Sequence, residues 1–109
     1  MRIVSGNLRG SKLHIPSDKN TRPLKDMVRE SIFNLLTHSN KIYTDLENSN
    51  VLDLYSGTGS FGLECLSRKA KFTYFIENKE IALKILEKNI EKLKIKKKQK
   101  YFLMMYLKY

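Results

Sequence analysis

The feature that most constrains the fold of this chain is a glycine-rich loop, Gly57-Thr58-Gly59-Ser60-Phe61-Gly62. It follows the short apolar run Val51–Tyr55, which is typical of a buried parallel strand, and it opens a segment, Ser60–Arg68, with helical character. Glycines let a backbone pass close to a ligand, and a helix start offers free N–H groups. The loop therefore predicts a nucleoside-cofactor site. The alternative is a tight turn whose glycines serve packing alone.

The segments after the loop continue the alternation of strand and helix. Phe72–Ile76 is rich in aromatic and β-branched residues and predicts a second strand. Asn78–Ile95 predicts a helix, whose apolar stripe contains Ala82, Leu86, Asn89 or Ile90, and Leu93. Tyr101–Leu107 is either a third strand or a disordered apolar end. This order indicates an α/β fold with right-handed crossovers.

The first forty residues have a different pattern. Met1–Val4 and Ser11–Ile15 flank a turn at Gly10, which predicts a small β-hairpin. A helix is expected from Pro23, ending near residues 37–40. Its buried face is predicted from the i, i+4, i+7, i+8 spacing of apolar residues, namely Val28, Ile32, Leu35 and Leu36. We therefore divide the chain into an N-terminal hairpin and helix, residues 1–40, and a second part that contains the glycine loop, residues 41–109.

Two acidic residues accompany the glycine loop. Glu77 ends the second predicted strand, twenty residues after Gly57, where a carboxylate can accept hydrogen bonds from both hydroxyls of an adenosine ribose. Asp53 lies four residues before Gly57. A carboxylate there disfavours the pyrophosphate of NAD and suits the cationic sulfonium and ammonium groups of S-adenosylmethionine. S-adenosylmethionine is thus the expected cofactor and NAD the alternative. Asp53 has a structural alternative too, as a buried acid that accepts hydrogen bonds from local N–H groups.

Charge and composition narrow the class of protein further. The 109 residues carry a net charge of +10, but residues 92–109 hold seven lysines and no acid, a run typical of a solvated or disordered tail. No apolar run approaches the ~20 residues that a membrane helix needs, and no secretory signal is evident. The single cysteine, Cys65, is expected to be a buried apolar residue in a reducing, cytoplasmic setting, and His14 and His38 indicate no metal site.

Several blocks of the chain resemble one family, in order from residue 1 to about residue 95. Val51–Arg68 (VLDLYSGTGSFGLECLSR) is similar to motif I of the RsmD-type methyltransferases, which methylate the N2 amine of a guanine in 16S ribosomal RNA. The hairpin MRIVSGNLRGSKL, the block Thr21-Arg22-Pro23 with Val28–Asn34, and FIENKEIALKILEKNIEKL resemble further blocks of the same enzymes. The resemblance implies a partial Rossmann-like S-adenosylmethionine-dependent methyltransferase fold with an N-terminal β-hairpin and helix. Residues 1–40 would then be a substrate-side extension, and residues 41–109 the truncated N-terminal part of the methyltransferase domain.

The resemblance also implies roles for individual residues. Asp53, Gly57 and Gly59 would line the S-adenosylmethionine pocket, and Glu77 would hold the ribose. The basic residues that would lie near RNA are Arg2, Arg9, Lys12 and Arg22. Arg22 and Arg29 could equally be packing or helix-surface residues with no contact to RNA. The implied partner is 16S rRNA or the small ribosomal subunit, in the cytoplasm, with no membrane and no metal.

The chain departs from the family in one respect that bears on catalysis. The family aligns the guanine amine with an Asn/Asp-Pro-Pro-Tyr/Phe loop, whereas the only prolines here are Pro16 and Pro23. No catalytic residue is therefore assigned. We expect a truncated or frame-disrupted copy, or a fragment, that is inactive alone and leaves Val51–Leu54 as an apolar sheet edge. The alternative function is a non-catalytic RNA- or nucleotide-binding remnant.

Overall fold

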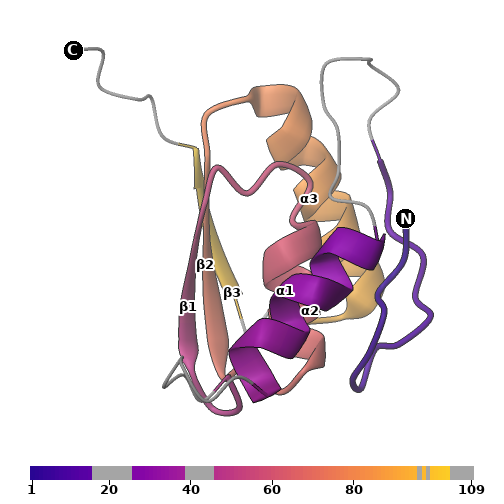
Figure 1. Cartoon of the computed structure of the whole chain (residues 1–109). Helices are drawn as coiled ribbons and strands as arrows, with labels where there is room; N and C mark the ends of the chain where they lie inside the picture. The colour runs from indigo at the N-terminus through magenta and orange to yellow at the C-terminus, as the bar shows by residue number, and fades with distance from the viewer. Residues whose placement is uncertain (16–25, 39–45, 96, 98, 104–109) are drawn as a thin grey trace.

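The fold is built on a parallel β-sheet with its described helices on one side (Figure 1). The computed structural model of the chain describes residues 1–15, 26–38, 46–95, 97 and 99–103. Three strands, in the order β1-β2-β3, form the sheet: β1 (Asn50–Leu54), β2 (Phe72–Glu77) and β3 (Gln99–Leu103). The predicted α/β, partial Rossmann-like fold is confirmed.

The register of the sheet fixes which residues share its covered face. Asp53 of β1 pairs with Phe75 of β2, and Phe75 pairs in turn with Tyr101 of β3. Side chains alternate between the two faces of a sheet, so Asp53, Phe75 and Glu77 point toward the helices. Of the two alternatives for Tyr101–Leu107, the strand is correct as far as Leu103; residues 104–107 lie outside the described part of the chain.

Two helices cover this face: α2 (Ser60–Ser67) and α3 (Glu80–Leu93). Gly62 of α2 sits so close to β2 that a Cβ atom there would overlap the Phe75 ring. On α3 the predicted stripe is confirmed, because its apolar members and Asn89 are all buried. The third glycine of the loop therefore brings the helix against the sheet, which fits the packing role of that position.

The first helix, α1 (Asp26–His38), is present, but its predicted buried face is only half correct, since Ile32 and Leu36 are partly buried. Val28 and Leu35 are 45% and 54% exposed, whereas Arg29 and Phe33 are fully buried. Phe33 stacks on Phe61 of α2 with ring centroids 5.0 Å apart. Arg29 lies on the buried face of α1 because its guanidinium group pairs with the buried carboxylate of Glu64. The predicted start at Pro23 lies outside the described residues.

The N-terminal segment forms the predicted hairpin in minimal form. Arg2 and Lys12 make a single antiparallel bridge. Around it the Ile3 N–H donates to the Ser11 carbonyl at 2.9 Å, and the Leu13 N–H donates to the Met1 carbonyl at 2.9 Å. Ile3 and Leu13 are buried in the same hydrophobic cluster as the helices and the sheet. The segment is therefore part of the core and packs on the helices rather than on the sheet (Figure 1).

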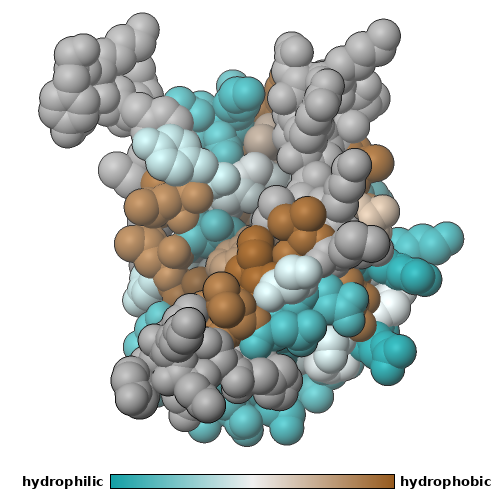
Figure 2. Space-filling model, in the orientation of Figure 1, coloured by the Kyte–Doolittle hydropathy of each residue, from teal (hydrophilic) through white to brown (hydrophobic). Residues whose placement is uncertain are grey.

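The face of the sheet opposite the helices is open and apolar. Leu52 and Leu54 of β1 are 61% and 56% exposed, and the neighbouring Tyr74 of β2 is 40% exposed. Hydrophobic residues are visible at the β1 side of the molecule in Figure 2. Among the described residues β1 has a strand neighbour on one side only, as expected for an edge strand.

Candidate cofactor site

The glycine loop lies at the carboxyl end of the sheet, where β1 turns into α2. Ser56 is fastened to the neighbouring strand, because its N–H donates to the Ile76 carbonyl at 3.0 Å. Gly57 and Gly59 have φ values of +58° and +89°, which favour glycine. These two positive φ angles let the chain reverse within four residues and start α2 at Ser60.

The two glycines have different surroundings. A Cβ atom at Gly57 would meet nothing within 4 Å, so this part of the loop borders open space. A Cβ atom at Gly59 would instead overlap the Leu86 side chain of α3. Gly59 therefore lets α3 approach the loop, and its contact with a cofactor stays a prediction. Gly57 is the glycine that offers a ligand room.

Glu77 is held at the end of β2, next to Gly57, and is 5% exposed. Its Oε1 accepts a hydrogen bond from the Gly57 N–H at 2.8 Å, which ties the glycine loop to the second strand. Its Oε2 accepts from the N–H groups of Asn78 at 2.9 Å and Lys79 at 2.7 Å, at the start of α3. A carboxylate has about four acceptor positions, so this geometry leaves about one, which is enough for a single ribose hydroxyl and not for the two that the sequence predicted.

Asp53 lies on the same covered face, and its Oδ2 accepts a hydrogen bond from the Gly62 N–H at 3.1 Å. This is the structural alternative that the sequence left open, a buried acid bonded to local backbone. Burial raises the pKa of Asp53 from 3.8 to about 6. The hydrogen bond from Gly62 partly opposes this shift, and the negative charge of Glu77 adds to it. The Glu77 charge is the smallest of these three causes, but it shows that the two carboxylates interact, and two interacting negative charges are a favourable surrounding for a cation.

The residues of this site fit S-adenosylmethionine. The Asp53–Glu77 pair offers negative charge to its sulfonium and ammonium groups, and Gly57 leaves space beside the loop. The buried Ser56 Oγ also has no hydrogen-bond partner among the described residues, although buried hydroxyls are nearly always bonded. An orphaned hydroxyl at the glycine loop is a further polar group that a bound ligand would satisfy.

Three of the four predicted RNA-side residues lie on the N-terminal hairpin. Arg2, Arg9 and Lys12 are exposed, and Arg22 lies outside the described residues. Arg29 is fully buried, so of its two alternatives the packing role holds. The Lys12 carbonyl accepts a hydrogen bond from the Lys92 Nζ at 2.7 Å, which fastens the hairpin to α3.

Sequence reasoning missed the polar residue that joins the N-terminal segment to α2, Glu64. It is fully buried, and its carboxylate accepts hydrogen bonds from the N–H groups of Val4 at 2.8 Å and Ser5 at 3.0 Å. It also pairs with the guanidinium groups of Arg68 at 2.9 Å and Arg29 at 3.5 Å. An acid inside the otherwise apolar helix segment FGLECL, four residues before an arginine, was the available signal.

Asn89 makes a second link that the sequence did not reveal. Its Oδ1 accepts from the His14 N–H at 2.6 Å, and its Nδ2 donates to the His14 carbonyl at 3.1 Å. The same Nδ2 donates to the Thr58 carbonyl in the glycine loop at 3.1 Å. This one side chain therefore joins the N-terminal segment to the predicted cofactor loop.

Three further features would bear on function in the described part of the chain: a reactive thiol, a metal site and a membrane-spanning helix. Cys65 is buried, and burial is the main cause that raises its pKa to about 12, so the thiol is the apolar residue that was predicted. Within the described ranges, no three His, Cys, Asp or Glu side chains are arranged to hold a metal ion. None of the helices described has the length and apolar character that crossing a bilayer requires.

Comparison with solved structures defines the class of protein. A structure described as a putative methyltransferase yhhF from Escherichia coli is similar to this chain with a TM-score of 0.79 and 32% identity, over 95% of this chain and 52% of that one. A putative methylase from Haemophilus influenzae gives a TM-score of 0.66 at 32% identity, over 94% of this chain and 51% of that one. The fold is thus that of a methyltransferase.

The particular family follows from sequence comparison. The family described as "Conserved hypothetical protein 95" matches residues 1–108, and this chain belongs to that family, which confirms the RsmD-type resemblance. The Ribosomal RNA small subunit methyltransferase D of Haemophilus influenzae is 36% identical over 99 residues, or 91% of this chain and 48% of the relative. The enzyme of the same name from Buchnera aphidicola is 36% identical over 93 residues, 85% of this chain and 46% of the relative. The chain spans about half the length of these curated relatives.

Proposed function

We propose that this chain is the S-adenosylmethionine-binding portion of an rRNA methyltransferase that acts on guanine N2 of 16S rRNA. The observation that carries the proposal is the buried carboxylate pair, Asp53 and Glu77, beside the open flank of Gly57. The names of the relatives support the class of substrate, since they are rRNA small subunit methyltransferases. The cytoplasm is the proposed location, because the single buried cysteine needs no oxidising compartment.

Each residue of the cofactor site has a separate proposed role. Bound S-adenosylmethionine supplies an activated methyl group. Glu77 accepts a hydrogen bond from a ribose hydroxyl at the acceptor position that the backbone leaves open. Asp53 offers its charge to the cationic end of the cofactor, and Gly57 lets the ligand approach the loop backbone. The same charge argues against NAD, because a carboxylate close to a pyrophosphate raises the free energy of binding.

The RNA side of the proposal rests on the N-terminal residues. Arg2, Arg9, Lys12 and Arg22 are proposed to contact the phosphates of 16S rRNA, in the context of the small ribosomal subunit, with residues 1–40 as the substrate-side extension. The first three are exposed on the hairpin, as phosphate-binding side chains must be. Residues 41–109 are proposed to hold the cofactor.

We further propose that these 109 residues alone transfer no methyl group, because they contain no Asn/Asp-Pro-Pro-aromatic sequence to align the amine. Incubation with tritiated S-adenosylmethionine and small-subunit RNA tests this. We expect no label in the RNA, while labelled cofactor is retained by the protein. Label in the RNA would contradict the proposed inactivity. Strong, salt-dependent RNA binding with no cofactor retained would favour the alternative, a non-catalytic RNA-binding remnant.

The cofactor site itself is tested by Glu77→Ala, with Glu80→Ala as the matched control. Glu80 is an exposed acid in the first turn of α3. We expect Glu77→Ala to weaken S-adenosylmethionine binding at least about tenfold, as the loss of a charged hydrogen-bond acceptor implies. Equal binding by the two variants, with circular dichroism spectra matching the parent chain, would overturn the assignment.

A further inference from the structure

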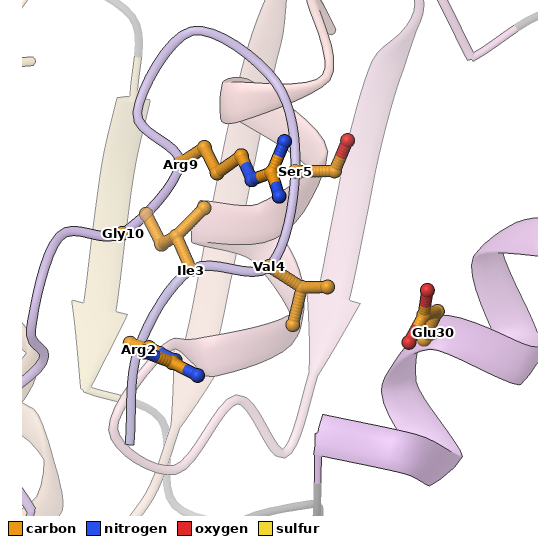
Figure 3. Close-up of a pocket in the computed structure, with 7 residues that line it drawn as sticks. All are labelled: Arg2, Ile3, Val4, Ser5, Arg9, Gly10 and Glu30. Atoms are coloured by element: carbon orange, nitrogen blue, oxygen red, sulfur yellow. The ribbon is translucent and has the colours of Figure 1, made fainter.

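A cavity that shares no lining residue with the glycine loop lies between the N-terminal segment and α1. Its volume is about 510 Å3, within the range of pockets that take small ligands. The residues that line it are Arg2, Ile3, Val4, Ser5, Arg9, Gly10 and Glu30. In Figure 3 the hairpin residues form one wall, and Glu30 faces them from α1.

The hairpin wall is suited to an anion. Arg2 and Arg9 both belong to it and are exposed, and no carboxylate among the described residues forms a salt bridge with either. Gly10 has no side chain to narrow this wall, and a Cβ atom there would meet nothing within 4 Å. Guanidinium groups match the oxygens of a phosphate in planar, two-point hydrogen bonds. A phosphate group is therefore an anion that this wall can bind.

The opposite wall adds a restriction. Glu30 is an exposed carboxylate on α1, and it repels a bare phosphate. A ligand that fills the whole cavity must therefore be anionic at one end and carry a hydrogen-bond donor at the other. A ribonucleotide unit has both groups, a phosphate and a ribose 2′-hydroxyl, and the 2′-hydroxyl is the group by which proteins distinguish RNA from DNA.

We propose that this cavity holds one nucleotide of single-stranded RNA, with its phosphate against Arg2 and Arg9 and its 2′-hydroxyl donating to Glu30. The inference relies on the proposed function to identify RNA as the partner, and it adds a defined binding site for one nucleotide. Lys12 does not line the cavity and is excluded from it. The arginines then bind the backbone, and Glu30 selects ribose over deoxyribose.

The phosphate contact is tested with Arg2→Ala/Arg9→Ala, using a labelled single-stranded oligoribonucleotide and fluorescence anisotropy. The matched control is Lys84→Ala/Lys88→Ala, which removes the same charge from exposed positions on α3. We expect the arginine variant to lose at least about tenfold in affinity, with a salt slope smaller by about 1, and the control to lose about threefold or less. Equal losses in the two variants would show diffuse attraction and overturn the site.

The 2′-hydroxyl contact is tested with Glu30→Ala against Glu47→Ala, an exposed acid outside the cavity. RNA and DNA of the same sequence are titrated into each. We expect Glu30→Ala to lower the ratio of RNA affinity to DNA affinity by about threefold or more, and Glu47→Ala to leave this ratio unchanged. An unchanged preference would refute the role of Glu30. S-adenosylmethionine binding, measured on the same variants, keeps this test separate from the proposed function, because the cavity shares no residue with the cofactor site.

Discussion

At the scale of single residues, the buried carboxylate of Asp53 destabilises the fold when it is ionised. Its pKa is about 6 in the folded chain and 3.8 in the reference state, because burial disfavours the charged form. The folded protein thus holds this proton more tightly than the unfolded chain. The cost of ionisation is absent below about pH 4, grows as the pH rises to about 6, and is complete above that. It amounts to about 3 kcal/mol at 1.36 kcal/mol per pKa unit.

Asp53→Asn should therefore stabilise the fold while it weakens the cofactor site. An amide keeps an acceptor for the Gly62 N–H and removes the repulsion with Glu77. We expect the free energy of unfolding to rise by about 1–3 kcal/mol at pH 7.5, and the gain to vanish below about pH 4. Urea unfolding over this pH range measures the gain in the free energy of unfolding and its loss at low pH. Glu47→Gln is the control at an exposed position. Destabilisation at pH 7.5 would contradict the account.

At the scale of secondary-structure elements, Glu64 fastens the N-terminal segment and α1 to α2. Its carboxylate is the shared acceptor for two backbone N–H groups of the segment and for the guanidinium groups of Arg29 and Arg68. Arg29 also donates to the Arg2 carbonyl, so the buried ion pair and the hairpin form one network. Breaking one partner of such a pair leaves an uncompensated buried charge.

Glu64→Ala should consequently lower the free energy of unfolding by about 3–5 kcal/mol. The control, Glu91→Ala at an exposed position on α3, should lower it by less than about 0.5 kcal/mol. Urea unfolding of both variants gives this comparison. Hydrogen exchange adds a local readout, since the amides of Val4 and Ser5 should lose their protection first. A Glu64→Ala variant as stable as the control would show that the network does not hold these elements together.

The glycines of the loop give a second prediction at this scale. Gly57→Ala places its Cβ atom in open space and should cost about 1–2 kcal/mol for its left-handed backbone, while weakening S-adenosylmethionine binding. Gly62→Ala pushes α2 away from Phe75 and should destabilise the fold by about 1–3 kcal/mol or more. Thermal unfolding and cofactor titration separate the two effects. Normal cofactor binding by Gly57→Ala would contradict the proposal that the ligand approaches the loop backbone at Gly57.

These elements also show how far sequence alone reaches. The strand, glycine loop and helix were predictable because their signals are local: an apolar run, glycines at fixed spacing and a period of 3.6 residues. The buried face of α1 was not, because the burial of Arg29 depends on Glu64, which is distant in the chain. The contact between Asn89 and the His14 backbone likewise has no local signal.

At the scale of the whole molecule, the helices protect one face of the sheet and leave the other open. The open face carries Leu52, Leu54 and Tyr74, next to the unpaired edge of β1 within the described sheet. Exposed apolar edge strands favour association between chains. We therefore expect the chain to self-associate, and its stability to be low unless a partner covers this surface.

Leu52→Lys/Leu54→Lys should reduce this self-association, which sedimentation velocity over a concentration series measures. The matched control is Val28→Lys/Leu35→Lys, which places the same charges on the exposed apolar side of α1. We expect a shift toward monomer in the first variant and a smaller one in the control. A parent chain that is monomeric throughout and unfolds cooperatively at high temperature would contradict the prediction.

The central claim, that the Asp53–Glu77 site holds S-adenosylmethionine, is tested most directly by titration calorimetry of the parent chain at neutral pH. S-adenosylmethionine and NAD are each titrated under the same conditions. The account predicts saturable binding of S-adenosylmethionine with one site per chain and no measurable binding of NAD. Binding of NAD with equal or greater affinity, or binding of neither ligand, would contradict it.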